Sequence, residues 1–354
     1  MARYIVLLLL CYISLPVFAS SPVASPRIIG GVTSQNDELP WQVYLNISFP
    51  NDGTYVCGGV LVAQDVVLTA AHCLQNGGLI ADAADIKVWG GISSIFSATS
   101  RNALSVSSRI INTNYNASRF SNDIAVLKLR SPAPDSAKPI LIATQDQQER
   151  ADLAFRTNYT QGGNNPANLL VSGWGSTSVN GSSGSSSLQQ TLLTGVPDNI
   201  CSNQWGAGVT DGEANIFVCA ISPSPLVVRD SCFGDSGGPL VWQDPLRPSD
   251  SDFGLRLLGL VSFGDGCASS LPGVYTEVLP FVGWINGLTA NSLLAVSTPA
   301  LSIDPFAKDY SNAGTDIAVP STDNISGSDG GGSVGILIIL GLFSLAMKRS
   351  RAAV

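Results

Sequence analysis

The chain is poor in ionisable side chains, and His72 is its single histidine. Only 12% of the residues are charged, and 26 acidic residues against 18 basic ones give a formal net charge of −8. A nucleic-acid-binding domain needs a basic surface for the phosphate backbone, so this balance argues against a nucleic-acid partner. No motif in the sequence resembles a cofactor or metal site. Because His72 is the single histidine, any imidazole base in this protein must be His72.

Glycine is abundant instead, with 36 residues, and serine is frequent as well. Together with the low charge, this composition favours short strands joined by turns over amphipathic helices. Apolar segments such as residues 65–68 and 124–129 fit strands of such a protein.

A glycine-flanked serine stands out at residues 230–239, which read DSCFGDSGGP. A serine hydroxyl such as that of Ser236 is a weak nucleophile until a base takes its proton and N–H groups face the developing oxyanion. Glycines beside it permit a tight turn and let a substrate carbonyl approach the backbone. A Gly/Ser surface loop would look similar, so the run needs a base elsewhere in the chain.

His72 lies in residues 66–73, VVLTAAHC, where an apolar strand runs into a turn of small residues that ends in a cysteine. The two alanines leave room around the ring, and Cys73 can fix the turn. A carboxylate that orients the imidazole is expected at the edge of an apolar strand, and residues 122–129, NDIAVLKL, supply Asp123. Taken alone, His72 reads as a solvated or core histidine and Asp123 as a strand cap.

The three motifs occur in the order His, Asp, Ser, which is the order of the chymotrypsin group. With VSGWG at residues 171–175 and PGVY at residues 272–275, the chain resembles a trypsin-like serine protease of the chymotrypsin type, the S1 family. The resemblance implies an all-β fold of two antiparallel six-stranded β-barrels, roughly residues 28–140 and 141–278, with a short C-terminal helix over residues 279–288.

The resemblance also implies a role for each residue of the site. Ser236 attacks the scissile carbonyl, His72 accepts its proton and passes it to the leaving amine, and Asp123 orients and stabilises the imidazole. The N–H groups of Gly234 and Ser236 match the oxyanion hole, and Ser262 matches the serine that supports the acid. This mechanism is the general template of the family.

A primary (S1) specificity pocket is implied in the same way, with an acid at its base six residues before the nucleophile. A slot with small walls and a carboxylate floor selects a long cationic side chain, because a buried carboxylate needs a partner. We therefore expect cleavage after Arg or Lys. Phe263 replaces the tryptophan common in the family, which leaves the subsites beyond the first open. The residues that match the pocket are Asp230, Ser231, Ser262, Gly264 and Gly273.

Residues 27–31, RIIGG, resemble the junction at which the zymogens of this family are cut. Cleavage after Arg27 would free the α-amino group of Ile28, which can insert and pair with a buried carboxylate; Asp235 is the matching acid. Without that partner the buried carboxylate is costly, so the uncut chain should have a poorly formed oxyanion hole. The activating protease must itself cut after Arg.

Seven cysteines are present, and Cys11 falls in the N-terminal apolar stretch, which leaves six. Six cysteines allow fifteen connectivities. Complete pairing would imply an oxidising compartment. The pattern of the family selects the pairs Cys57–Cys73, Cys201–Cys219 and Cys232–Cys267.

Residues 1–19 carry one positive charge, a short apolar region and a small residue at the end, which are features of a signal peptide. Cleavage there would leave an activation propeptide over residues 20–27 and a peptidase domain over residues 28–288. This organisation predicts a secreted or cell-surface protein.

After the peptidase domain the sequence turns polar, and residues 289–333 read as a disordered Ser/Gly-rich linker. Residues 334–354 contain a 14-residue apolar run, too short for a comfortable membrane span, and a basic end. The tail resembles the GlyGly-CTERM sorting signal, which implies removal by a rhomboid-like protease, transient inner-membrane anchoring and export by the type II secretion machinery. A eukaryotic GPI signal and a retained weak anchor are the alternatives.

The leading interpretation is a secreted serine endopeptidase, made as a zymogen, that cuts protein or peptide substrates after Arg or Lys. The alternative is a catalytically inactive homologue that keeps the fold as a binding protein. Such proteins usually lose a triad residue or the oxyanion glycine, and neither is missing here. Residues 86–122 contain no Asp or Glu, so we expect no calcium site in the loop where some relatives hold one.

Overall fold

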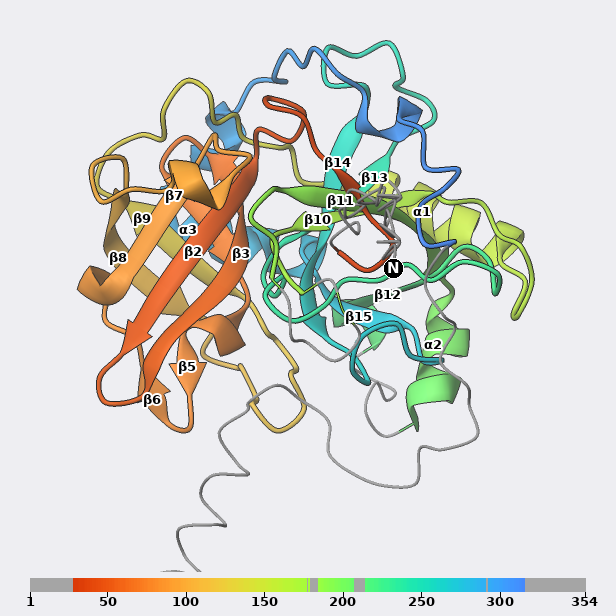
Figure 1. Cartoon of the computed structure of the whole chain (residues 1–354), viewed down its shortest axis with the longest axis horizontal. Coiled ribbons are helices and arrows are strands. Elements are labelled where there is room, and N and C mark those ends of the chain that lie inside the picture. The colour runs from red at the N-terminus through yellow and green to blue at the C-terminus, as the bar shows by residue number, and fades with distance from the viewer. Residues whose placement is uncertain (1–27, 177, 179–183, 207–213, 291, 316–354) are drawn as a thin grey trace, which may run out of the picture.

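The computed structural model describes residues 28–315, apart from residues 177, 179–183, 207–213 and 291. Two β-barrels stand side by side in this part of the chain (Figure 1). The predicted signal peptide, the propeptide with Arg27 and the sorting tail over residues 334–354 lie outside the described residues. No helix in the described part is long and apolar enough to cross a membrane.

The first barrel consists of β2 (Gln42–Phe49), β3 (Gly53–Ala63), β4 (Val66–Thr69), β7 (Ile86–Gly90), β8 (Leu104–Ile111) and β9 (Ala125–Leu129). The strands are antiparallel and close in the order β2-β3-β4-β9-β8-β7. The side chains of β2 alternate between the interior and the outside, so that Val43, Leu45 and Ile47 are buried while the residues between them are partly exposed. A small hairpin of β5 (Gln75–Asn76) and β6 (Leu79–Ile80) follows the turn after β4.

The second barrel consists of β10 (Leu169–Gly173), β11 (Gln189–Val196), β12 (Phe217–Ile221), β13 (Pro239–Gln243), β14 (Leu255–Phe263) and β15 (Gly273–Glu277). These strands pair antiparallel in the order β11-β10-β13-β14-β15-β12, and the pairing of β11 with β12 closes the barrel. The short strand β1 (Val32–Thr33) pairs with β11 on the outside of this ring. The predicted fold of two six-stranded antiparallel barrels is confirmed.

Helices cover the outside of the barrels in the described part of the chain. α1 (Gln145–Asn158) docks on the second barrel through Arg150, whose Nη2 lies 2.6 Å from Oδ2 of buried Asp244. α2 (Asp198–Trp205) carries Cys201, which is bonded to Cys219 of β12. α3 (Val282–Leu288) is the predicted C-terminal helix, and a 3-10 turn over residues 279–281 precedes it.

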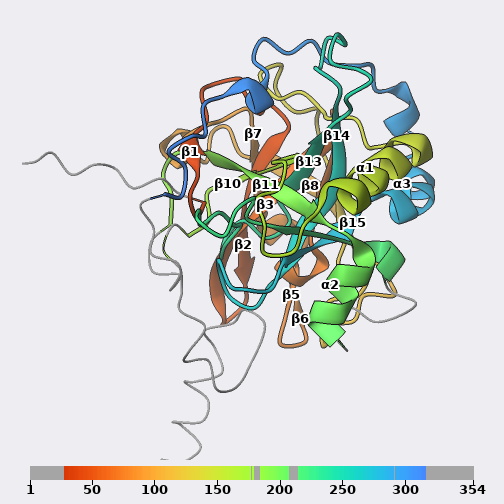
Figure 2. The same cartoon turned by 90° about the vertical axis from the view of Figure 1, so that its right-hand side faces the viewer.

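Residues 292–315, which we name the C-terminal strap, are not the disordered linker that the sequence predicts. The strap leaves α3 and crosses both barrels, at the top of Figures 1 and 2, with 3-10 turns at Ser292–Ala295 and Pro305–Ala307. Its Tyr310 and Ala313 are buried, with 6% and 2% exposed. The prediction was wrong here because the strap is held by distant parts of the chain, through apolar packing of Tyr310 and Ala313 and through bonds such as that of Lys308 to the Thr33 carbonyl. Neither leaves a regular hydrophobic period in the strap itself.

Glu277 at the end of β15 is poorly placed for a negative charge. Burial and the nearby carboxylates of Asp152 and Asp198 raise its pKa from 4.5 to about 8. The folded protein keeps a proton that the unfolded chain releases, so stability is lost as the pH rises from 4.5 to about 8. We expect Glu277→Gln to raise Tm above pH 8 and to change it little below pH 4.5. Thermal unfolding followed by circular dichroism measures this, with exposed Glu149→Gln as the control; a lower Tm above pH 8 would contradict the assignment.

Candidate active site

His72 sits in a 3-10 turn, Ala71–Cys73, directly after β4. The turn is held by the disulfide between Cys57 and Cys73 and by Thr69, whose hydroxyl donates to the carbonyl of Gly58 over 2.8 Å. Ala70 and Ala71 are fully buried, while the His72 side chain keeps 22% of its surface exposed. The small residues therefore pack the turn inward and leave the imidazole at the surface of the first barrel.

Asp123 precedes β9 and is completely buried. Its Oδ1 accepts the backbone N–H of His72 at 2.8 Å, and its Oδ2 lies 2.7 Å from the Nδ1 of the same residue. Ser262 of β14 donates its hydroxyl to the same Oδ2 over 2.6 Å, and Thr276 of β15 donates to the Asp123 carbonyl over 3.0 Å. In the neutral ring this carboxylate favours the proton on Nδ1, which leaves Nε2 with the lone pair of a base.

Ser236 lies on the second-barrel side, in the loop before β13, and its backbone contacts the histidine turn. Its carbonyl accepts the N–H of Gly58 over 2.8 Å, and Gly58 follows Cys57, the disulfide partner of the residue after His72. Gly237 has a φ of +75°, and a Cβ there would lie 2.2 Å from Oγ1 of Thr69. Any other residue would push the serine loop away from the first barrel, so this glycine keeps the two halves of the site together.

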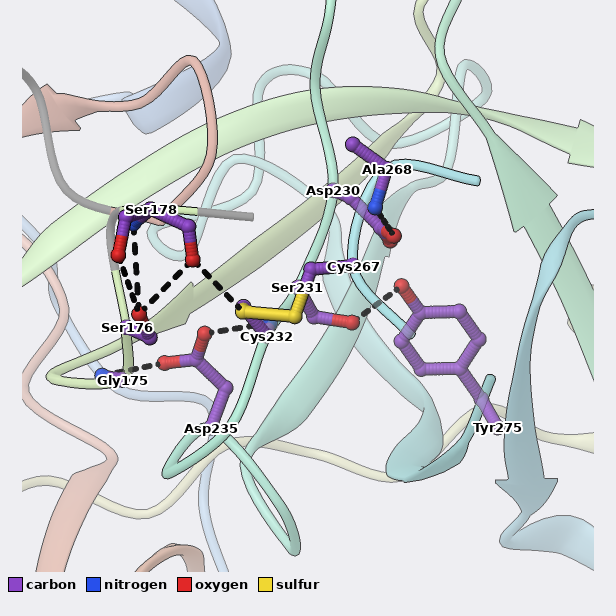
Figure 3. Close-up of a disulfide and its surroundings, with 10 residues drawn as sticks. All are labelled: Gly175, Ser176, Ser178, Asp230, Ser231, Cys232, Asp235, Cys267, Ala268 and Tyr275. Atoms are coloured by element: carbon purple, nitrogen blue, oxygen red, sulfur yellow. Dashed lines mark hydrogen bonds between the residues drawn. A yellow bond between two sulfur atoms is a disulfide. The ribbon is translucent and has the colours of Figure 1, made fainter. Parts of the chain in front are cut away.

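The turn before the nucleophile is built around Asp235, which is completely buried. Its two carboxylate oxygens accept the N–H groups of Gly175 at 2.8 Å and Cys232 at 2.9 Å (Figure 3). Gly234 adopts a φ of +97°, and a Cβ added there would lie 3.0 Å from the Cα of Gly175, so a side chain is disfavoured at this position. Burial raises the pKa of Asp235 to about 7, against the two hydrogen bonds that lower it.

Asp230 lines a cavity of about 200 Å³ together with Ala268 and Gly273. Its Oδ2 accepts the N–H of Ala268 over 2.7 Å, and the Ser231 hydroxyl lies 3.1 Å from that of Tyr275 (Figure 3). Burial raises the pKa of Asp230 to about 7, in spite of its backbone hydrogen bonds. The disulfide between Cys232 and Cys267 ties this wall of the cavity to the serine loop.

Comparison with known proteins identifies this arrangement, since the family model described as Trypsin matches residues 28–285. The chain belongs to the trypsin family. It is 34% identical over 276 residues to "Trypsin alpha" of Drosophila melanogaster, which covers 77% of this chain and 91% of that protein. "Trypsin epsilon" of Drosophila erecta is 34% identical over 268 residues, 75% of this chain and 88% of that protein. "Cationic trypsin-3" of Rattus norvegicus is 32% identical over 281 residues, 77% of this chain and 96% of that protein.

Membership of the trypsin family makes this protein a serine protease. The family model begins at Ile28 and ends before the C-terminal strap. The three disulfides of the described part join the pairs that the resemblance implied: Cys57–Cys73, Cys201–Cys219 and Cys232–Cys267. An inactive binding protein is not favoured, because the residues of the nucleophilic site are all retained.

A row of aromatic side chains lies next to His72, and the sequence of this trypsin-family protein did not predict it. The rings of His72 and Phe120 meet edge to face with centroids 5.6 Å apart, and Phe120 stacks on Phe263 at 5.4 Å. Trp205 and Phe217 close around Phe263 at 5.2 and 5.6 Å. Phe263 is thus the centre of an aromatic cluster that links both barrels. The sequence could not predict the role of Phe120, because nothing in it distinguishes this residue from an ordinary surface phenylalanine.

The residues around His72 do not favour a metal centre in this trypsin-family protein. In the described part of the chain, His72 clusters with Cys57 and Cys73 at metal-ligand distances. Both cysteines are oxidised to a disulfide, and the imidazole Nδ1 is engaged with Asp123. Thiolates are the form of cysteine that binds a metal, so this cluster cannot hold one without reduction.

The pH profile of this trypsin-family protein should reflect the environment of His72. Burial alone would lower its pKa, but the charge and the hydrogen bond of Asp123 together raise it above 6.5. Because a protonated imidazole cannot accept the serine proton, we expect the acid limb of kcat to have its midpoint above pH 6.5. Steady-state kinetics with an arginine amide measure this midpoint. A kcat that does not fall as the pH drops through this midpoint would exclude His72 as the base.

Proposed function

We propose that this protein is a secreted serine endopeptidase that hydrolyses peptide bonds after Arg or Lys. The observation that carries the specificity is the carboxylate of Asp230 in a cavity of about 200 Å³, where its hydrogen-bond partners are backbone N–H groups. A carboxylate held in this way is strongly stabilised by a cation that enters the cavity. Arginine and lysine side chains carry such a cation on a long apolar stem. Gly273 lines the same cavity as Asp230. We assign Ser231, Ser262 and Gly264 to the proposed pocket from the family resemblance alone.

In the proposed mechanism, Nε2 of His72 takes the proton of the Ser236 hydroxyl as the oxygen bonds to the scissile carbonyl carbon. The positive imidazole that forms is stabilised by Asp123, which stays ionised and is itself held by Ser262. The same proton then passes to the leaving amine, and water repeats the sequence to release the acyl group. The backbone N–H groups of Gly234 and Ser236 would hold the oxyanion, a contribution of about 3–4 kcal/mol for one donor.

Activation is proposed to follow cleavage after Arg27, which lies outside the described residues. Ile28 and Ile29 are fully buried, and Ile28 packs in the core of the second barrel. In the described part of the chain, the partners of buried Asp235 are N–H groups and not a cation. A freed α-amino group at Ile28 would supply that cation and stabilise the turn that carries the oxyanion donors. The activating protease must cut after Arg.

The remaining assignments concern the ends of the chain. We propose that residues 1–19 are a signal peptide, that residues 20–27 are the propeptide and that the tail over residues 334–354 is a GlyGly-CTERM-like sorting signal. Removal of the tail by a rhomboid-like protease and export by a type II system would release the enzyme. The peptidase domain is proposed to extend beyond residue 288, since the strap packs on its body.

The proposed activity is tested by incubating the protein, cut after Arg27, with matched peptide amides that carry Arg, Lys, Gln or Glu before the scissile bond. The Arg and Lys amides are expected to turn over much faster than the Gln and Glu amides, and Ser236 should be labelled covalently by an organophosphonate. Mass spectrometry of the secreted protein fixes both ends in the same preparation. Absence of both turnover and labelling after cleavage at Arg27 would refute the protease assignment.

A further inference from the structure

The C-terminal strap ends against the loop that precedes Asp230. Arg229 is buried with 9% exposed, and its guanidinium binds two backbone carbonyls of the strap. Nε donates to the carbonyl of Ala313 over 2.9 Å, and Nη2 donates to that of Tyr310 over 2.6 Å. The N–H of Val228 donates to the carbonyl of Gly314 over 2.9 Å. The strap therefore supplies the partners of a buried cation that is adjacent in sequence to the proposed specificity residue.

Residues 29–30, which follow the proposed activation cleavage, lie against the same loop. The N–H of Asp230 donates to the carbonyl of Ile29 over 3.1 Å. A Cβ on Gly30 would lie 2.1 Å from the carbonyl oxygen of Val228 and 2.8 Å from the Cα of Gly314. The strap, the loop over residues 228–230 and residues 29–30 are thus packed backbone to backbone.

The strap is anchored along its length as well as at its end. Lys308 pairs with buried Glu38 at 2.7 Å and donates to the carbonyl of Thr33 over 2.7 Å. Earlier in the strap, Asp304 accepts the side-chain amide of Gln243 at 3.1 Å. These contacts tie the strap to β1 and β13 of the second-barrel sheet, so the end of the strap is fixed relative to that barrel and can hold a loop in place.

We propose that the C-terminal strap is a positioning element for the primary specificity pocket, acting through Val228 and Arg229 on Asp230. Both of these residues line the same cavity as Asp230. The strap lies beyond the part of the chain that the trypsin model matches, which ends at residue 285. The inference rests on the proposed function, since it assigns the strap to the pocket of that enzyme. Removal of the proposed sorting tail over residues 334–354 would leave the strap intact.

Two substitutions test the proposal in the otherwise complete chain, cut after Arg27. In Gly314→Ala the new Cβ would lie 2.3 Å from the Val228 carbonyl, so strap and loop must separate. Gly78→Ala is the matched control, because it adds the same atom at a φ of +87° with nothing within 4 Å. Arg229→Lys keeps the positive charge but loses the guanidinium group, whose N–H groups reach the carbonyls of Ala313 and Tyr310.

We expect Gly314→Ala and Arg229→Lys to raise KM for an arginine amide about tenfold, with kcat within about twofold of the unmodified protein, since the pocket binds substrate and transition state alike. Labelling of Ser236 by an uncharged organophosphonate should keep its rate, and Gly78→Ala should keep KM. A lower Tm with unchanged KM in both variants would overturn the proposal, because the strap would then only cover the barrel.

Hydrogen exchange on the unmodified protein keeps the proposal testable if the variants do not fold. The Val228 amide should exchange slowly, as a group bonded to Gly314, and rapid exchange would overturn the docking of the strap. A cut protein that never turns over the arginine amide refutes the proposed function instead. The exchange of Val228 still decides the docking in that case, so the two failures are distinguishable.

Discussion

Replacing Ser236 with alanine is expected to lower kcat for an arginine amide by about a millionfold, the loss seen when a serine protease loses its nucleophile. No other group in the described site can take its place, because His72 and Asp123 hold each other at 2.7 Å and serve as base and orienting acid. The fold should not change, since the loop is held by the backbone of Ser236, whose carbonyl accepts the N–H of Gly58. Single-turnover kinetics with the cut protein measure the loss.

The triad should also behave as one unit. Adding His72→Ala to Ser236→Ala is expected to cost little further activity, because a base without a nucleophile contributes almost nothing. The residual rate over water would come from substrate binding and from the oxyanion donors. Ser48→Ala, at a serine that contacts the Thr54 hydroxyl on the exposed side of the first barrel, is the control and should retain full activity. Organophosphonate labelling that persists in Ser236→Ala would mean that the nucleophile is another residue.

The residues of this site could be predicted because each lies in a short motif with few alternative interpretations. The single histidine before Cys73 leaves no choice of imidazole base, whereas Asp123 was chosen as the orienting acid through the family motif, because Asp65 also precedes an apolar strand. The partners that hold them could not be predicted. Thr276 and Gly58 act through backbone carbonyls of Asp123 and Ser236, and such bonds between distant segments leave no pattern in either segment.

The same distinction holds for the fold. The family resemblance predicted the two barrels, and apolar segments such as residues 124–129 were only consistent with their strands. The polar helix α1 has few buried positions, among them Ala151 and Phe155, so its sequence does not carry a strong helical period. Phe155 fits because β11 has a glycine opposite it, where a Cβ would lie 2.3 Å from the ring. Only the folded chain reveals that complementarity.

The C-terminal strap shows most clearly what the sequence could not predict. Its polar, proline-containing sequence has the composition of a linker, yet its end is fixed by Arg229 and its middle by Lys308. Both interactions pair a cation from one segment with backbone or carboxylate groups about 80 to 270 residues away. Composition describes the segment itself and contains no information about the surface that receives it.

Replacing Asp230 with serine is expected to lower kcat/KM for an arginine amide by roughly a hundredfold to a few thousandfold, which corresponds to about 3–5 kcal/mol for a buried charge that loses its partner. The preference over a glutamine amide should disappear with it. The labelling of Ser236 by an uncharged organophosphonate should remain, because Asp230 contacts Ala268 and not the nucleophile. Exposed Asp65→Ser is the control for the loss of one negative charge. Retained arginine preference in Asp230→Ser would refute the pocket assignment.

The same residue should also impose a pH dependence that is separate from that of His72. Burial raises the pKa of Asp230 to about 7, so the empty pocket holds a proton below that pH. A substrate cation must displace this proton, because it stabilises the ionised carboxylate. KM for the arginine amide should therefore rise as the pH falls below 7, whereas KM for a glutamine amide should not. The acid limb from His72 acts on kcat and affects both substrates, so separate profiles of KM and kcat distinguish the two groups. In Asp230→Ser the KM profile for the arginine amide should become flat, and a profile that keeps its slope would assign the proton to another residue.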